Sequence, residues 1–363
     1  MGKKSDNIFA RLARRWFIDA FSAMALGVFA TLLIGTIIGQ IGSWIGAFIG
    51  ENDSWAILIR DFFIKLSEYA KNGYVVGGAI GVAIANGLKA KPLVIFSAAG
   101  CGAVGYVEGG GPIGAYLATL VGAELSQLIA GKTRFDILLV PSVSLLSGGI
   151  VGILTGPYID RFCDWIGREL GIAMGLHPVL MGIIVSVVMG LALTAPISSA
   201  AISVVVFDAA LFTADSSIAL AAGVATVGCC CQMVGFAVSS WRENGFSGFL
   251  AQGLGTSMLQ ISNIVKHPLI LIPPTLASAI LGPIAATLLT VENGAGVFAG
   301  MGTCGLVGPA GMWMYMMSGG FDWFAFVKIL LMCFILPAIL SLVISEGMRR
   351  AGWIKKGDMY LEL

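Results

Sequence analysis

Three short stretches of the sequence place a carboxylate beside glycine, a combination that could bind a hydroxyl-rich or cationic solute. They read Glu108-Gly109-Gly110-Gly111-Pro112, Glu243-Asn244-Gly245 and Glu292-Asn293-Gly294. Carboxylate and amide oxygens accept hydrogen bonds from hydroxyls, and glycine lets backbone N–H groups approach a solute closely. A solvent-exposed turn at a helix end is the alternative for each stretch, because Glu, Asn and Gly are common there.

A fourth stretch, Thr194-Ala195-Pro196-Ile197-Ser198-Ser199, interrupts a long apolar run. Proline frees a backbone carbonyl in such a run, and Ser or Thr hydroxyls can satisfy it again. That structural role is one interpretation, and the lining of a polar pathway is the other. We predict that Thr194, Pro196, Ser198 and Ser199 converge with the three carboxylate stretches on one solute cavity.

The remaining reactive side chains suggest no catalytic chemistry. Glu124 and Asp208 lie in or beside apolar runs, where ionisable groups are functional candidates. The seven cysteines, among them the run Cys229 to Cys231, lack metal-ligand spacing. The sequence contains no HExxH, no Walker loop and no nucleophile elbow. We therefore expect no enzyme activity, no metal and no cofactor.

The elements that must position these residues are membrane helices. Of the 363 residues, 57% are hydrophobic and 11% are charged, whereas a soluble domain carries roughly 25% charged residues. Because about 20 apolar residues span a bilayer, each charge-free run can hold at least one crossing. These runs cover residues 20–50, 170–207, 244–265 and 293–321. The prediction is an all-α polytopic membrane protein with about 10–12 transmembrane segments and interrupted helices.

Basic residues are concentrated at the two ends of the chain. The positive-inside rule then predicts that both termini are cytoplasmic, which requires an even number of crossings. Nucleic-acid binding is the weaker interpretation, because basic residues commonly flank an apolar helix, and no nucleic-acid partner is expected. The residues concerned are Lys3, Lys4, Arg11, Arg14 and Arg15 before the first helix, and Arg349, Arg350, Lys355 and Lys356 after the last.

An internal repeat appears when the chain is shifted by about 133 residues. Gln127 then aligns with Gln260 and Pro141 with Pro274, together with several apolar residues and glycines. We predict a single membrane domain, residues 1–363, that contains a duplication. Repeat 1 covers about 17–157, repeat 2 about 178–291, and an extra helical pair about 295–345.

Charge indicates the orientation of the two repeats. Lys132 and Arg134 lie in one loop of repeat 1, whereas the matching loop of repeat 2 has only Lys266 and His267. Fewer basic residues fit a loop on the outer side. An inverted repeat would place it there, and inverted repeats are an architecture of secondary transporters. The first two carboxylate stretches would then face each other across the midplane.

Four strings resemble a known family of membrane proteins. They are FIDAFSAMALGVFATLLIGTIIG, GGGPIGAYLATLVGAE, LTAPISSAAI and HPLILIPPTLASAILGPIA. Together they resemble membrane EIIC-like proteins of the perfringolysin-regulator type, which are classed with the EIIC permeases of the phosphotransferase system. The resemblance covers about residues 17–345.

The resemblance implies a multi-pass permease of the bacterial inner membrane, typically a homodimer, with inverted repeats and an elevator-like cycle. Its relatives carry sugars that are phosphorylated on entry, a step that needs a phosphocarrier domain with a Cys or His phosphosite. The chain contains no such domain, so coupled phosphorylation would need a separate phosphotransferase subunit. The predicted function is transport of a small polar solute, sugar-like or another small metabolite. The alternative is a membrane ligand sensor that regulates gene expression without transport.

Overall fold

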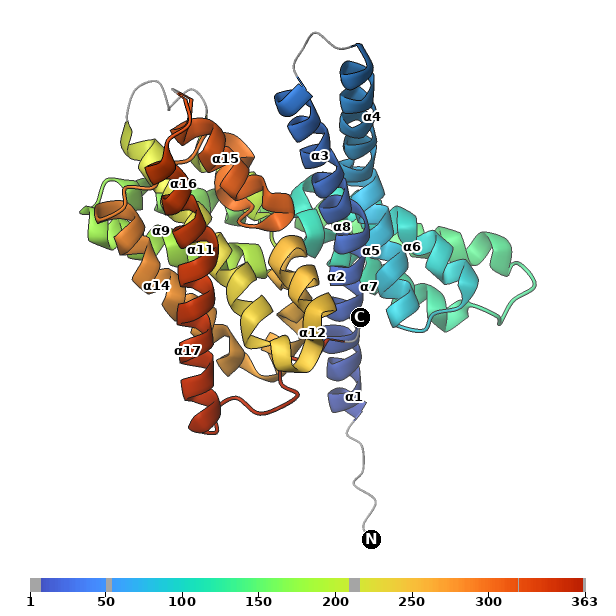
Figure 1. Ribbon diagram of the computed structural model, residues 1–363. Helices are drawn as coiled ribbons and strands as arrows, with labels where there is room; N and C mark the ends of the chain where they lie inside the picture. The colour runs from blue at the N-terminus through green and yellow to red at the C-terminus, as the bar shows by residue number, and fades with distance from the viewer. Residues whose placement is uncertain (1–7, 50–53, 209–215, 319, 362–363) are drawn as a thin grey trace. The chain divides into compact units, whose positions relative to one another are not determined.

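The computed structural model describes residues 8–49, 54–208, 216–318 and 320–361, and these residues form helices and connecting turns without a strand (Figure 1). The all-α prediction is confirmed. The α-helices are α1 (Ile8–Arg14), α2 (Ala20–Val28), α3 (Ile34–Ile49), α4 (Ser54–Lys71), α5 (Gly73–Gly87), α6 (Pro92–Gly105), α7 (Gly111–Ile129), α8 (Asp136–Met174), α9 (Pro178–Thr194), α10 (Ser199–Val206), α11 (Ser216–Ser239), α12 (Trp241–Leu250), α13 (Ile261–Lys266), α14 (Ile272–Thr287), α15 (Val307–Met316), α16 (Trp323–Leu330) and α17 (Leu336–Arg350).

Short 3₁₀ or π-helical turns, labelled η, extend or connect these helices. They are η1 (Arg15–Asp19), η2 (Phe29–Leu33), η3 (Tyr106–Gly110), η4 (Ala251–Gly255), η5 (Ser257–Gln260), η6 (Pro268–Leu271), η7 (Gly296–Gly300), η8 (Cys304–Leu306) and η9 (Leu331–Ile335). Several of them lie where the sequence contains glycine or proline. Interrupted helices are therefore a feature of the fold.

Six helical stretches of the described residues are long and apolar enough to cross a bilayer. Two further apolar helices, α5 and α9, are shorter. The chain is therefore a polytopic membrane protein, and the number of crossings stays a prediction because breaks divide several apolar runs into short helices. The six stretches are Arg11–Gly46, Pro92–Ile129, Asp136–Met174, Ser217–Ser239, Pro268–Thr287 and Trp323–Arg350.

The chain divides into two compact units. The first contains Met1–Leu32, Ala70–Asp160 and Ile261–Lys266, and the second contains Leu33–Tyr69, Arg161–Gln260 and His267–Leu363. The duplication and its inverted orientation stay predictions.

In the first unit, α5, α6 and α7 pack against one another and α2 packs on α5 (Figure 1). Glycine makes the close approach of α5 and α6 possible. A Cβ added at Gly81 would lie 2.1 Å from the carbonyl oxygen of Ala98, and one added at Gly102 would lie 2.1 Å from that of Gly77. Small residues at such crossings let helix backbones come together in lipid, so the glycines of these apolar runs are packing residues.

In the second unit, α11 is the central helix. It contacts α9, α14 and α17 (Figure 1), and 89% of its apolar stretch is buried. A helix that is apolar all round is expected to be buried on every side, and α11 has this composition. Its few polar side chains therefore meet other parts of the protein, and they organise the candidate site.

Candidate functional site

Two breaks interrupt the helices of the second unit, at opposite ends of the paired short helices α10 and η7. One is the Thr194–Ser199 stretch between α9 and α10, and the other is the segment between α14 and η7 that contains Glu292 and Asn293. The hydroxyl of Ser199 donates to the carbonyl of Gly300 at 2.8 Å. The Thr194–Ser199 break thus lies beside the end of η7, whereas the break that contains Glu292 and Asn293 precedes the start of η7.

Two further hydrogen bonds hold the short helices α10 and η7 together. The hydroxyl of Ser203 donates to the carbonyl of Gly296 at 2.6 Å, and the N–H of Gly296 donates to the carbonyl of Phe207 at 2.8 Å. Both elements are too short to cross a bilayer. They end within the second unit and leave helix termini beside the breaks.

Local sequence explains why α9 ends where it does. Ala195, which precedes Pro196, is extended with φ −70° and ψ 157°, because a residue before proline disfavours the helical region. Ser198 then caps α10, and its hydroxyl accepts from the N–H of Ala201 at 3.1 Å. Ser198 and Pro196 are half-buried, so they line the break.

Thr194 belongs to a buried polar cluster beneath this break. Its hydroxyl lies 2.8 Å from that of Ser257 and donates to the amide oxygen of Gln232 at 3.3 Å. The amide nitrogen of Gln232 donates to the hydroxyl of Thr275 at 3.1 Å. Thr194 therefore has a structural role at the break. Gln232 was not among the predicted residues, although a lone amide in a charge-free apolar helix is a signal that could have identified it.

Asn293 holds the second break against α11. Its backbone N–H donates to the carbonyl of Ala219 at 3.0 Å, and its amide nitrogen donates to the hydroxyl of Thr226 at 2.7 Å. Gly223 of α11 makes room for this contact, because a Cβ there would lie 1.9 Å from the carbonyl oxygen of Val291. Asn293 is fully buried, and these contacts hold the backbone next to Glu292 in place.

Glu292 has an available carboxylate. The residue is half-buried, and its side chain forms no hydrogen bond or ion pair with a described residue. Its neighbours Val291 and Asn293 are buried, which fixes the backbone from which it extends. An ionised carboxylate accepts several hydrogen bonds and donates none. Glu292 is therefore free to accept hydroxyl donors from a solute.

The first predicted stretch forms a break between α6 and α7 in the first unit. Glu108 (φ −76°, ψ 24°) and Gly109 (φ 89°) leave the helical region, and Pro112 is buried in the first turn of α7. The loop packs closely against α8. A Cβ added at Gly156 of α8 would lie only 2.0 Å from the carbonyl oxygen of Glu108, so the contact requires glycine there. The side chain of Glu108 is exposed and pairs with no described residue.

Gly111 and Gly245 share an unusual backbone conformation. Gly111 has φ 52° and ψ −146°, and Gly245 has φ 58° and ψ −156°. This region is essentially restricted to glycine. Each glycine follows a glutamate at short distance, Glu108 in one unit and Glu243 in the other. The equivalence of these two loops in a repeat stays a prediction.

Glu243 and Asn244 bind the C-terminal segment of the chain. Glu243 accepts from Arg349 at 2.9 Å through Oε1 and from the N–H of Met359 at 2.9 Å through Oε2. Asn244 donates to the carbonyl of Met359 at 2.8 Å and accepts from the N–H of Leu361 at 2.8 Å. Both carboxylate oxygens of Glu243, and both the oxygen and the nitrogen of the Asn244 amide, are thus hydrogen-bonded. The sequence does not predict this role, because nothing in it places residues 359–361 beside α12.

The predicted residues therefore have different surroundings. Glu108 and Glu292 have available carboxylates in separate units, Glu243 and Asn244 are occupied, and Thr194, Ser199 and Asn293 are buried and hydrogen-bonded. The convergence of all four stretches on one cavity stays a prediction. Within the described residues, no group of three or more His, Cys, Asp or Glu side chains could hold a metal ion.

Comparison with known proteins identifies one similar family. The family described as "Phosphotransferase system, EIIC" matches residues 18–361. Neither a curated protein nor a solved structure shows a significant match to the chain. The match covers both units and all four stretches.

Proposed function

The chain belongs to the phosphotransferase system EIIC family of membrane permeases, and on this premise we propose that it carries a small polar solute, sugar-like or another small metabolite, by elevator-like alternating access. The observation that carries the proposal is the available carboxylate of Glu292, held on the helix break that precedes η7 in the second unit. Hydroxyl groups of a sugar-like solute would donate to it.

The surroundings of Glu292 suit a polar solute. The ends of α10 and η7 lie beside the two breaks, and helix ends carry unpaired backbone groups and partial charge. Repeat transporters bind solutes at such interrupted helices. Gly294, half-buried beside Glu292, supplies a backbone that a solute can approach, and the half-buried Ser198 would supply a hydroxyl at the Thr194–Ser199 break. In this proposal Asn293 positions the loop rather than contacting the solute.

An elevator-like cycle requires a compact body that moves as a whole. In the second unit the buried helix α11, with α9 and α14 packed on it, has the internal packing that such a body needs. Glu108 of the first unit, exposed on its glycine-rich loop, is proposed as a second solute contact. Glu243 and Asn244 would contact solute only in a state in which the C-terminal segment has left them.

We place the protein in the bacterial inner membrane as a homodimer with both termini in the cytoplasm. Phosphotransferase proteins are proposed as the partners that would phosphorylate the solute. These statements rest on family membership and on the basic ends of the chain.

Transport is tested by uptake of radiolabelled solutes into proteoliposomes, after a stability screen has identified a ligand of the purified protein. Binding to the folded state raises the unfolding midpoint by mass action. The Glu292→Gln variant should lose that ligand-induced shift, whereas Glu169→Gln, an exposed carboxylate of α8 without a described partner, should keep it. A ligand that binds tightly but never accumulates inside the vesicles would favour the sensor function instead.

A further inference from the structure

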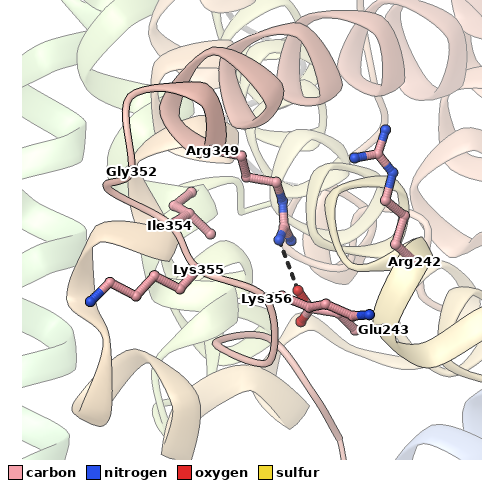
Figure 2. A pocket seen from close by; sticks show the side chains of 7 residues that line it. All are labelled: Arg242, Glu243, Arg349, Gly352, Ile354, Lys355 and Lys356. Carbon is pink, nitrogen blue, oxygen red and sulfur yellow. Dashed lines mark hydrogen bonds and ion pairs between the residues drawn. The ribbon is translucent and has the colours of Figure 1, made fainter.

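A basic cavity lies at the C-terminal end of the second unit. It has a volume of about 520 Å³ and is lined by four cationic side chains, with one carboxylate among them (Figure 2). Arg242 lies on one side of the contact between Arg349 and Glu243, and Lys355 lies on the other. The remaining cation is Lys356. A volume of this size lies within the range of small-molecule sites.

The positive charge of this cavity is only partly neutralised. Glu243 pairs with Arg349 at 2.9 Å, and Glu346 pairs with Arg242 at 3.1 Å. Lys355 and Lys356 are exposed, and their ammonium groups form no ion pair or hydrogen bond with a described residue. Two positive charges therefore remain available. The nearby Asp358 is engaged elsewhere, because it lies 3.7 Å from His267 and accepts from the backbone N–H of Lys355.

The two lysines are held on an ordered backbone. The N–H of Lys355 donates to Asp358 at 2.7 Å, and Ile354, the residue before it, is buried. On the far side of the turn, the N–H of Met359 donates to Glu243 at 2.9 Å. The segment that carries the lysines is thus fixed at both ends against the second unit, and the cavity is preformed.

The position of the cavity along the chain places it near lipid phosphates. Arg349 lies at the end of the membrane-spanning stretch Trp323–Arg350, and Arg242 follows the end of Ser217–Ser239 by three positions. The ends of spanning helices lie at the level of the polar headgroups. Basic pockets at this level are suited to the headgroups of anionic lipids.

We propose that this cavity binds a phosphate-bearing group, supplied either by an anionic phospholipid headgroup or by a small soluble phosphate ester. Phosphate oxygens accept strong, charge-assisted hydrogen bonds from lysine and arginine. The two unpaired lysines are the principal binding groups, and the exposed Arg242, whose side chain is 70% accessible, is the third. The site is separate from the Glu292 region and does not depend on the proposed transport function.

The test uses the full-length protein and the double variant Lys355→Gln/Lys356→Gln, which leaves the Arg349–Glu243 pair intact. The matched control is Lys132→Gln/Arg134→Gln, which removes two exposed cations from the loop before α8. Calorimetric titration of solubilised protein with short-chain phosphatidylglycerol tests the lipid source, with short-chain phosphatidylcholine as the neutral comparison. Titration with glycerol 3-phosphate and with inorganic phosphate tests the soluble source.

The wild type and the control should bind one of the two phosphate sources, and the lysine variant should bind that source more weakly. For the lipid the loss should be roughly 25-fold, because each lysine contributes about fivefold near an anionic surface. Thermal unfolding midpoints in bilayers of phosphatidylcholine, alone and mixed equally with phosphatidylglycerol, give an independent reading. Binding that is unchanged in the lysine variant, or weakened equally in the control, would overturn the proposal. So would the absence of binding to every probe in the wild type.

Discussion

Arg349 and Glu243 lie 106 positions apart in the sequence and form the most buried ion pair of the described residues. The guanidinium Nη1 is 2.9 Å from the carboxylate Oε1, and the two side chains are 13% and 3% exposed. The same carboxylate accepts from the backbone of Met359. One ion pair therefore joins α12, α17 and the C-terminal segment.

Removal of one partner of this pair should strongly destabilise the protein. Glu243→Gln leaves a buried guanidinium without its counter-charge, and breaking a buried pair in this way costs about 3–5 kcal/mol. The loss is measured by thermal or denaturant unfolding in detergent. Glu346→Gln breaks the neighbouring pair with the exposed Arg242, and it should cost less than about 1 kcal/mol. Equal losses in the two variants would show that the Glu243 pair has no special structural role.

Glu292 and Asn293 should respond differently to substitution. Glu292→Gln removes a carboxylate without a described partner, so ligand binding should fall while the unfolding midpoint of the ligand-free protein stays within error. Asn293→Ala removes a buried amide and leaves Thr226 without its donor, so stability should fall by about 1–3 kcal/mol and ligand binding with it. Both quantities come from one thermal-shift experiment with and without ligand. A stability loss in Glu292→Gln would indicate a structural role for its carboxylate.

The shared conformation of Gly111 and Gly245 predicts a backbone effect. Nothing lies within 4 Å of a Cβ added at either position, so Gly111→Ala and Gly245→Ala would cause no clash. The strain of this φ/ψ region alone should cost about 1–3 kcal/mol. Gly149→Ala in α8 is the control, because it has the same open space and no positive φ. This control should raise the stability of the protein by up to about 1 kcal/mol, because alanine favours the helix over glycine. The thermal unfolding midpoints of the three variants test both expectations.

Both ends of the chain should lie in the cytoplasm. Reporter fusions that are active only inside or only outside the cell, placed at the N-terminus and at the C-terminus, should report the same side. This result follows from the basic residues that flank the first and last helices. Fusions on opposite sides would exclude an even number of crossings and with it the predicted topology.

The overall class of the fold could be predicted from the sequence because lipid restricts the options. A spanning segment must satisfy its own backbone hydrogen bonds, which in a bilayer leaves helices or closed barrels, and the long charge-free runs predict helices. The positions of the breaks were also predictable, because Pro196, Gly111 and Gly245 act on the backbone locally. The hydrogen-bond partners of Thr194 and Gln232 were not, since they come from distant helices.

Two copies of the same tripeptide show where sequence reasoning stops. Glu243-Asn244-Gly245 and Glu292-Asn293-Gly294 are identical in residue type, and by sequence alone both predict a carboxylate at a glycine break. In the structure, Glu243 and Asn244 bind the C-terminal segment, whereas Glu292 is available and Asn293 is buried against α11.

The sequence by itself determined the membrane class, the helices and the breaks, because each depends on residues close together in the chain. Only the tertiary structure decided which carboxylate stays open to a solute. The reason is physical: a buried carboxylate must find donors, and for Glu243 these donors are supplied by Arg349 and Met359, more than 100 positions away.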